Sequence, residues 1–162
     1  MINEIDKQIL TILQENARTP NAEIARQIGM APSAILERIR KLEERGVIRG
    51  YGVRLNGRAL GLGLLAFVLV RTDELSVEED AAQQLARMPE VLEVHHIAGE
   101  DCFLIKVRTA DTESLGRLLR EQIGAIESVR STRTTIVLHT AKETEALPVQ
   151  DFSQEGEGDQ NG

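Results

Sequence analysis

The second half of the chain alternates extended and helical segments in an order that few folds share. Residues 64–72 form an apolar, β-branched run of strand length, and strand-like patterns recur at 91–97, 102–109 and 129–140. Apolar residues at helical spacing mark residues 76–88 and 112–123. The order βαββαβ predicts an α+β, ferredoxin-like domain in which two helices cover one face of an antiparallel sheet.

The other face of that sheet must contact water or another chain. Many strand residues predicted to point outward are aliphatic, and a large exposed apolar sheet surface is prone to aggregation. We therefore expect copies of the chain to pair through this face.

Three shorter helices are predicted in the first half. The first is capped by Asn3 and ends near Asn16, and the second is expected to open with Thr19 as its cap and Pro20 as its first residue. The apolar faces of these two helices and of a third helix can pack into a small core, although each helix alone would be only marginally stable.

The third helix begins at Pro32 and stops before Gly46. Its apolar residues Ile35, Ile39 and Leu42 recur at the spacing of one helix face. A tight turn around Gly29 joins it to the second helix, which predicts a helix-turn-helix. The alternating residues 47–56 after it predict a short strand or a two-stranded wing.

The two halves differ in charge. The whole chain carries a net charge of −7, but residues 1–56 contain nine Lys and Arg against seven Asp and Glu, a net of +2, whereas residues 57–162 contain ten against nineteen, a net of −9. Such asymmetry indicates a basic functional module beside an acidic remainder. Because +2 is modest, binding to nucleic acid would need several copies of the module or additional backbone contacts to phosphates.

Several classes of protein are disfavoured. The single Cys102 rules out an intrachain disulfide framework, no apolar run reaches the length of a membrane span, and the first residues lack a signal pattern, so we expect a cytoplasmic protein. Aromatic residues make up 2% of the chain, which disfavours stacking on single-stranded nucleic acid. His95 and His96 point to opposite faces of a strand, and no catalytic set emerges, so we predict neither a metal site nor an enzyme.

Five motifs, in this order and spacing, give the chain a family resemblance. They are IDKQIL, AEIARQIGMAPSAILERIRKLEERGVIRGY, NGRALGLG, AGEDCFLIKVRT and VRSTRTTIVLHTAKETEALP. Together they resemble the Lrp/AsnC (leucine-responsive/asparagine regulator, feast/famine) family of transcription regulators over residues 2–149. The resemblance implies a winged helix-turn-helix domain, a ferredoxin-like amino-acid-regulation (RAM) domain, dimers that assemble further, and a small effector, often an amino acid, bound between regulatory domains.

The sequence departs from the family at three positions. Ala31 replaces a Ser or Thr cap before the third helix, Gly57 replaces a frequent Pro and is expected to loosen the hinge, and Cys102 replaces a larger residue. The first change weakens a helix start, and the last leaves the shape of an effector pocket open.

The third helix is predicted to lie in the major groove of DNA. Ser33 and Ala34 are small enough for close approach to bases, while Glu37 would either accept from cytosine or pair with Lys41. The alternative for the whole set is a solvated face of intrahelical ion pairs. The predicted DNA-binding residues are Ser33, Ala34, Glu37, Arg38, Arg40, Lys41, Arg26 and Arg49.

The effector hypothesis rests on a predicted hairpin turn, where Gly99 would let a ligand approach the backbone and Asp101 would take an amino group. The alternative is a plain turn, in which Gly and Asp are favoured anyway. The resemblance places this turn at an interface near the last strand. The predicted effector residues are Gly99, Glu100, Asp101, Thr134, Thr135 and Ile136.

Four parts of the chain are predicted: a helix-turn-helix domain at 1–56, a hinge at 57–63, a ferredoxin-like effector and oligomerisation domain at 64–142, and an acidic, largely disordered tail at 143–162. The predicted function is sequence-specific regulation of transcription at a pseudo-palindromic duplex site, with an amino-acid effector and no cofactor. Two alternatives remain: an architectural DNA binder without an effector, and a regulatory subunit of an amino-acid-metabolism enzyme.

Overall fold

The computed structural model describes residues 2–73, 75–99 and 102–149. The chain folds into two compact units. The first, which we call the reading unit, comprises Met1–Arg54 together with Glu143–Gly162, and the second, the sheet unit, comprises Leu55–Lys142. None of the described helices is long and apolar enough to cross a membrane.

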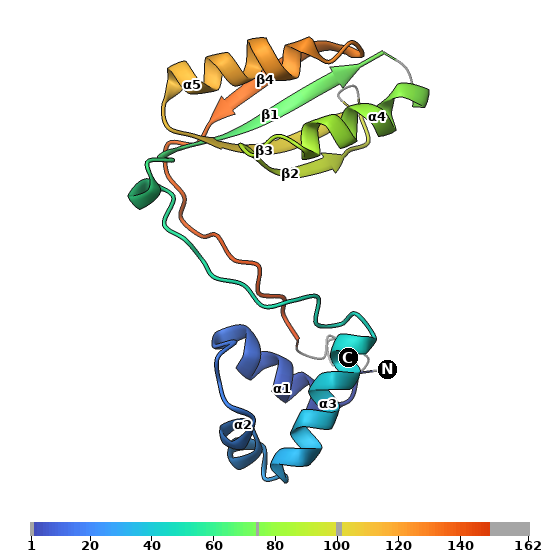
Figure 1. The fold of residues 1–162 in the computed structure, drawn as a ribbon, viewed down its shortest axis with the longest axis vertical. Helices are drawn as coiled ribbons and strands as arrows, with labels where there is room; N and C mark the ends of the chain where they lie inside the picture. The colour runs from blue at the N-terminus through green and yellow to red at the C-terminus, as the bar shows by residue number, and fades with distance from the viewer. Residues whose placement is uncertain (1, 74, 100–101, 150–162) are drawn as a thin grey trace, which may run out of the picture. The chain divides into compact units, whose positions relative to one another are not determined.

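The reading unit is built from three helices, α1 (Glu4–Glu15), α2 (Asn21–Ile28) and α3 (Pro32–Glu44) (Figure 1). Their apolar stripes meet in one core, as the helical spacing predicts. The buried members of that core are Ile9, Ile24, Ala25, Ile35, Ile39 and Leu42, each at most 7% exposed.

The helix starts agree with the sequence at α1 and α3 but not at α2. The Asn3 side chain accepts from the Asp6 amide while Asp6 accepts from the Asn3 amide, which is a reciprocal cap. In α2 the cap is Pro20 and the first helical residue is Asn21. The prediction that Thr19 caps α2 is wrong, because its hydroxyl donates to the Asn16 carbonyl instead.

Residues 47–56 form neither the predicted short strand nor a two-stranded wing. A β-strand requires a hydrogen-bonded neighbour, and within the described part of this single chain no segment pairs with these residues. These residues have the alternating pattern of a strand, but the described chain provides no neighbouring strand with which they could pair.

The sheet unit has the predicted βαββαβ order. Its elements are β1 (Leu64–Thr72), α4 (Leu75–Ala86), β2 (Val91–His96), β3 (Phe103–Thr109), α5 (Thr112–Arg117) and β4 (Val129–Ile136). The strands lie in the order β2-β3-β1-β4, and every neighbouring pair is antiparallel. The two helices lie over one face of the sheet (Figure 1), so the ferredoxin-like prediction is confirmed.

Two elements of the sheet unit, α5 and β4, end at least four residues earlier than predicted. After α5 the chain continues as a π-helix, Leu118–Gln122, and a short 3-10 helix, Ile123–Ala125. The wider π turn brings the buried side chains of Leu118 and Ile123, five residues apart, to the same side. Strand β4 ends at Ile136, which pairs with Ala66, and the Val137 amide makes one more hydrogen bond to the Leu65 carbonyl. Because β1 begins at Leu64, the residues after Val137 lie beyond the start of their partner strand.

The glycine-rich stretch predicted as a hinge is a folded turn. The Gly57 carbonyl accepts hydrogen bonds from the Leu60 and Leu62 amides. A short 3-10 helix, Arg58–Leu60, directly follows Gly57. A Cβ atom at Gly57 would lie 2.8 Å from Nη1 of Arg108, whose guanidinium donates to the Leu62 carbonyl. Gly57 therefore permits close packing, contrary to the expectation that it loosens the chain.

Candidate nucleic-acid interface

Helix α3 has an N-terminus suited to an anion. Pro32 occupies the first helical position, and Ala31 before it provides no side-chain cap. Pro32 has no amide hydrogen and the Ala34 amide donates to the Ala31 carbonyl, so the Ser33 amide, together with the helix dipole, is the first-turn group placed to meet a phosphate. Ser33 is exposed and Ala34 is half-buried, and both side chains are small, which leaves room for a ligand beside them.

The predicted DNA-binding cations on the helices are paired with carboxylates in the free chain. Arg40 contacts Glu44 at 2.8 Å, Lys41 contacts Glu37 at 3.4 Å, and Arg26 contacts Glu23 at 2.6 Å. Such exposed pairs contribute little to stability and are screened by salt, so a phosphate can replace the carboxylate. Of the two roles predicted for Glu37, the free chain shows the ion pair with Lys41.

Arg26 forms the most extensive of these pairs. Its guanidinium donates two hydrogen bonds to the Glu23 carboxylate. The side-chain amide of Gln27 donates a third hydrogen bond to the same carboxylate. These bonds lower the pKa of Glu23 to about 2. The carboxylate therefore stays charged through the physiological range and competes with DNA for Arg26.

Arg38 is placed differently from the other predicted contacts. Its Nη1 lies 2.8 Å from Oδ1 of Asp6 on α1, and the Asp6 side chain is only 9% exposed. The Arg38 side chain is 29% exposed. Because the pair joins α1 to α3, the structure gives Arg38 a role in holding the reading unit together.

Replacing Arg38 by alanine is expected to destabilise the reading unit by about 1–3 kcal/mol, because a mostly buried Asp6 charge loses its partner. Arg40→Ala is the matched control on the same helix. Its exposed pair with Glu44 is worth less than about 0.5 kcal/mol. Tyrosine fluorescence during urea unfolding measures both variants, since the chain has one tyrosine, Tyr51, and no tryptophan. Equal losses for the two variants would contradict the structural role of Arg38.

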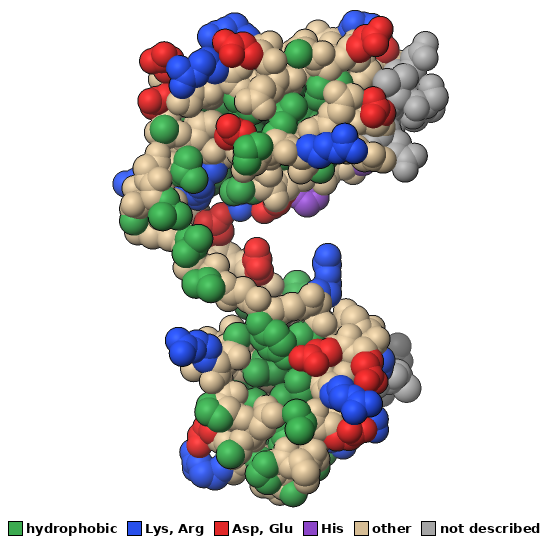
Figure 2. Space-filling view, viewed as in Figure 1, with side chains coloured by type: hydrophobic (Ala, Val, Ile, Leu, Met, Phe, Trp, Pro, Cys, Tyr) green, Lys and Arg blue, Asp and Glu red, His purple; other side chains and the backbone are tan. Residues whose placement is uncertain are grey.

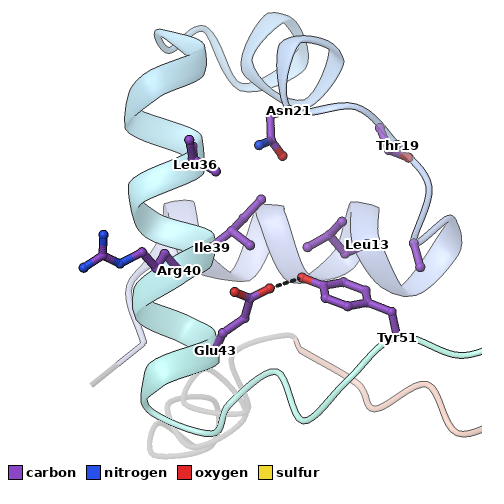
Figure 3. Close-up of a pocket in the computed structure, with 9 residues that line it drawn as sticks. Leu13, Thr19, Asn21, Leu36, Ile39, Arg40, Glu43 and Tyr51 are labelled. Atoms are coloured by element: carbon purple, nitrogen blue, oxygen red, sulfur yellow. Dashed lines mark hydrogen bonds between the residues drawn. The ribbon is translucent and has the colours of Figure 1, made fainter.

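A cavity of about 440 Å³ lies beside α3 in the reading unit (Figure 3). Its apolar lining includes Leu13, Ile39 and the 56% exposed Leu36. The Tyr51 hydroxyl donates to Oε1 of Glu43 at 2.8 Å at its edge. Burial and this carboxylate raise the pKa of Tyr51 to about 12, so the phenol keeps its proton. This cavity was not predicted from the sequence, although Leu36, an apolar residue off the core stripe of α3, was a signal for it.

Charges of both signs are interspersed over the reading unit. On the face drawn in Figure 2, hydrophobic side chains gather on this unit with Lys, Arg, Asp and Glu side chains around them, and the basic side chains form no single patch. Arg49, the remaining predicted contact, is exposed just after α3. On this face a single copy therefore presents separate basic side chains, without a continuous basic patch, to a nucleic acid.

The predicted effector residues fall on two parts of the sheet unit. Gly99 has a φ of 144° and lies in the turn between β2 and β3, while Glu100 and Asp101 lie outside the described residues. In β4, Thr134 is half-buried, and Thr135 and Ile136 are exposed.

Within the described part of one chain, the structure does not bring the turn together with the predicted residues of β4. The Cys102 amide donates to the Val70 carbonyl at the end of β1, whereas Thr134 pairs with Val68 and Ile136 with Ala66. Among the described residues, no group of three or more His, Cys, Asp or Glu could hold a metal ion. Cys102 itself is half-buried, with its sulfur 3.8 Å from the Thr72 carbonyl.

Comparison with known proteins covers both units. A family model described as Lrp/AsnC ligand binding domain matches residues 65–147, and one described as winged helix-turn-helix DNA-binding matches residues 2–49. The HTH-type transcriptional regulator FL11 of Pyrococcus horikoshii is 43% identical over 148 residues, covering 91% of this chain and 97% of that protein.

Solved structures give the same result. A transcriptional regulator of Neisseria meningitidis in complex with L-Met is 29% identical, with a TM-score of 0.87 and coverage of 92% of this chain and 97% of that one. AsnC of E. coli is 30% identical, with a TM-score of 0.86 and coverage of 91% and 99%.

Proposed function

Because the chain belongs to the Lrp/AsnC family of transcription regulators, we propose that it binds duplex DNA through α3 and that a small effector controls this binding. The observation that carries the proposal is the uncapped N-terminus of α3 with its small side chains, followed by an exposed polar and basic face. We assign DNA reading to residues 1–56 and effector binding and assembly to residues 64–142. The role is regulatory, since its relatives are transcription regulators rather than enzymes.

The predicted contact residues have different tasks in this proposal. The amide and hydroxyl of Ser33 hold a phosphate or a base edge, and Ala34 contacts a thymine methyl group. Arg40 and Lys41 exchange their carboxylate partners for phosphates, as do Arg26 and Arg49. Arg38 serves indirectly, by fixing α3 against α1.

The proposed effector is an amino acid. The ligand-binding domain and the L-Met complex of the Neisseria relative support this class. The residues proposed to bind it are Gly99, Glu100, Asp101, Thr134, Thr135 and Ile136. Because the two groups are separated within one chain, we propose that they meet between chains, so that the ligand changes assembly by its different affinity for the two states.

The uncovered sheet face is the proposed surface of assembly. Its central side chains include Phe67, which is 37% exposed, and the half-buried Leu69 and Leu104. Phe67 pairs with Lys106 on β3 and Thr135 on β4, so polar side chains border the apolar ones. An apolar centre with a polar border is typical of an interface between protein chains.

Phe67→Ala is expected to weaken self-association about tenfold, since a central aromatic side chain commonly contributes 1–2 kcal/mol or more to an interface, roughly a tenfold change. Sedimentation velocity over a range of protein concentrations measures the shift toward smaller species. Leu138→Ala is a suitable control, because Leu138 is 92% exposed beyond the end of β4. An unchanged distribution for Phe67→Ala would place the interface elsewhere.

The second candidate is an architectural DNA binder without an effector, which is favoured by the separation of the turn from the predicted effector residues of β4 within the described part of one chain. Titrating a labelled duplex at several salt concentrations, with and without each of the twenty amino acids, separates the two. An amino acid that changes the affinity supports the regulator, and indifference to all twenty favours the architectural function. Failure to bind duplex DNA would overturn both.

A further inference from the structure

A segment from the second half of the chain is attached to α1 in the reading unit. The Gln14 side chain accepts a hydrogen bond from the Leu147 amide at 2.7 Å and donates one to the Leu147 carbonyl at 3.0 Å. One side-chain amide thus satisfies both backbone groups of a residue 133 positions away in sequence. Because Leu147 is 74% exposed, the attachment depends on its backbone and not on burial of its side chain.

Two residues further on, Val149 lies beside both α1 and α2. It lines a cavity of about 420 Å³ together with Ile12 of α1 and Ile28 of α2. All three residues are half-buried, and the two isoleucines pack against the core of the reading unit. We call residues 143–149, which belong to this unit, the strap.

The two helices beside the strap are the ones that support α3. On α1, the carboxylate of the buried Asp6 forms an ion pair with Arg38 of α3 at 2.8 Å. On α2, Ile28 is the last helical residue, and the turn at Gly29 leads to the start of α3 at Pro32. Rigid helices and packed side chains of this kind can carry energetic coupling between separate sites. A shift of α1 or of the end of α2 therefore changes the support of α3.

We propose that the strap is a conformational device of the reading unit, in which its attachment to Gln14 and DNA binding by α3 favour each other. This rests on the proposed function, because α3 is the surface that responds. The attached strap holds α1 and the end of α2 in the position that supports α3, and its release removes part of that support. Because coupling between two sites is reciprocal, bound DNA in turn holds the strap in place.

Two pairs of substitutions in the full-length chain separate the attachment from other effects. Leu147→Pro removes the amide that donates to Gln14, whereas Leu147→Ala keeps this amide and is its matched control. On α1, Gln14→Ala removes both hydrogen bonds, and Gln8→Ala makes the same deletion at an exposed position of the same helix. None of these changes alters the net charge, so the electrostatic attraction of DNA stays constant.

Fluorescence anisotropy with a labelled mixed-sequence 30-base-pair duplex measures the affinity of each variant. Gln14→Ala and Leu147→Pro are each expected to weaken binding about fivefold or more, which lies in the usual range of coupling between sites. Their combination should weaken it no further, because both changes break the same contact. Leu147→Ala and Gln8→Ala should stay within about twofold of wild type. Wild-type affinity of Gln14→Ala and Leu147→Pro, or fully additive losses, would overturn the coupling while leaving DNA binding intact.

Hydrogen–deuterium exchange of the Leu147 amide, in overlapping peptides covering residues 143–149, separates the strap from the proposed function. Without DNA, this amide is expected to exchange about tenfold more slowly in wild type than in Gln14→Ala, which lacks both hydrogen bonds. Saturating duplex should slow it further in wild type. Equal exchange of the two free chains would overturn the strap, and unchanged exchange on bound duplex would overturn its coupling to α3. If no chain binds the duplex, the proposed function and the coupling both fail, whereas the attachment is still measured in the free chains.

Discussion

Replacing Phe103 by alanine is expected to destabilise the sheet unit by about 3–5 kcal/mol, the usual cost of removing a buried aromatic side chain from a core. Phe103 is 2% exposed and is the largest fully buried side chain among the residues whose burial is described. It lies among the fully buried Val68, Val70 and Ile105 in one cluster. The deletion leaves a cavity that strands on both sides cannot close. Urea unfolding followed by far-UV circular dichroism measures the loss.

Phe67→Ala makes the same chemical change on the opposite face of the same sheet. Because Phe67 is 37% exposed, its deletion is expected to cost clearly less stability at low protein concentration, where chains are separate. The Tyr51 fluorescence of the reading unit should be unaffected by either variant if the units unfold independently. Similar losses for Phe67 and Phe103 would contradict the assignment of a covered and an uncovered face.

Ser33→Glu is expected to reduce duplex affinity about 100-fold while leaving the fold intact. The new carboxylate would face the DNA backbone, and like charges brought together at an interface cost several kcal/mol. The same charge suits the helix, because an acidic residue in the first turn stabilises the helix dipole by about 0.3–1 kcal/mol. Loss of binding would therefore not reflect unfolding. Fluorescence anisotropy with the labelled duplex measures the affinity.

The control for this variant is Thr112→Glu, at the first position of α5 in the sheet unit. It adds an equal charge at an exposed helix start, far from the proposed DNA surface in sequence and in a different unit. We expect its duplex affinity to stay within a few fold of wild type. If Ser33→Glu binds as well as Thr112→Glu, α3 does not contact DNA.

The parts of the fold predicted from sequence are those encoded by local periodicity. The core stripes of α1, α2 and α3 follow directly from 3.6-residue spacing, and the buried Phe103, Ile105 and Val107 follow from alternation in β3. The cap at Asn3 was visible because it depends on neighbouring residues. The sheet order follows from the sequence of elements, since few arrangements of βαββαβ bury both helices.

The missed features depend on residues distant in sequence or on other chains. Arg38 and Asp6 are 32 residues apart, and no periodic pattern in the sequence indicates that they pair. The sequence therefore does not distinguish Arg38 from the other basic residues of α3. The attachment of Leu147 to Gln14 spans 133 residues. The strand predicted in residues 47–56 has the right pattern but no partner within the described chain, and the effector residues of the turn and β4 are separate within it.

The central claim, that α3 binds DNA, is tested most directly by hydrogen–deuterium exchange with and without saturating duplex. Bound duplex is expected to slow exchange in peptides covering residues 33–41, above all at the uncapped first turn, where no side chain protects the amides. Peptides covering α5 should exchange at an unchanged rate. Unchanged exchange across α3, under conditions in which anisotropy shows the duplex to be bound, would contradict the claim.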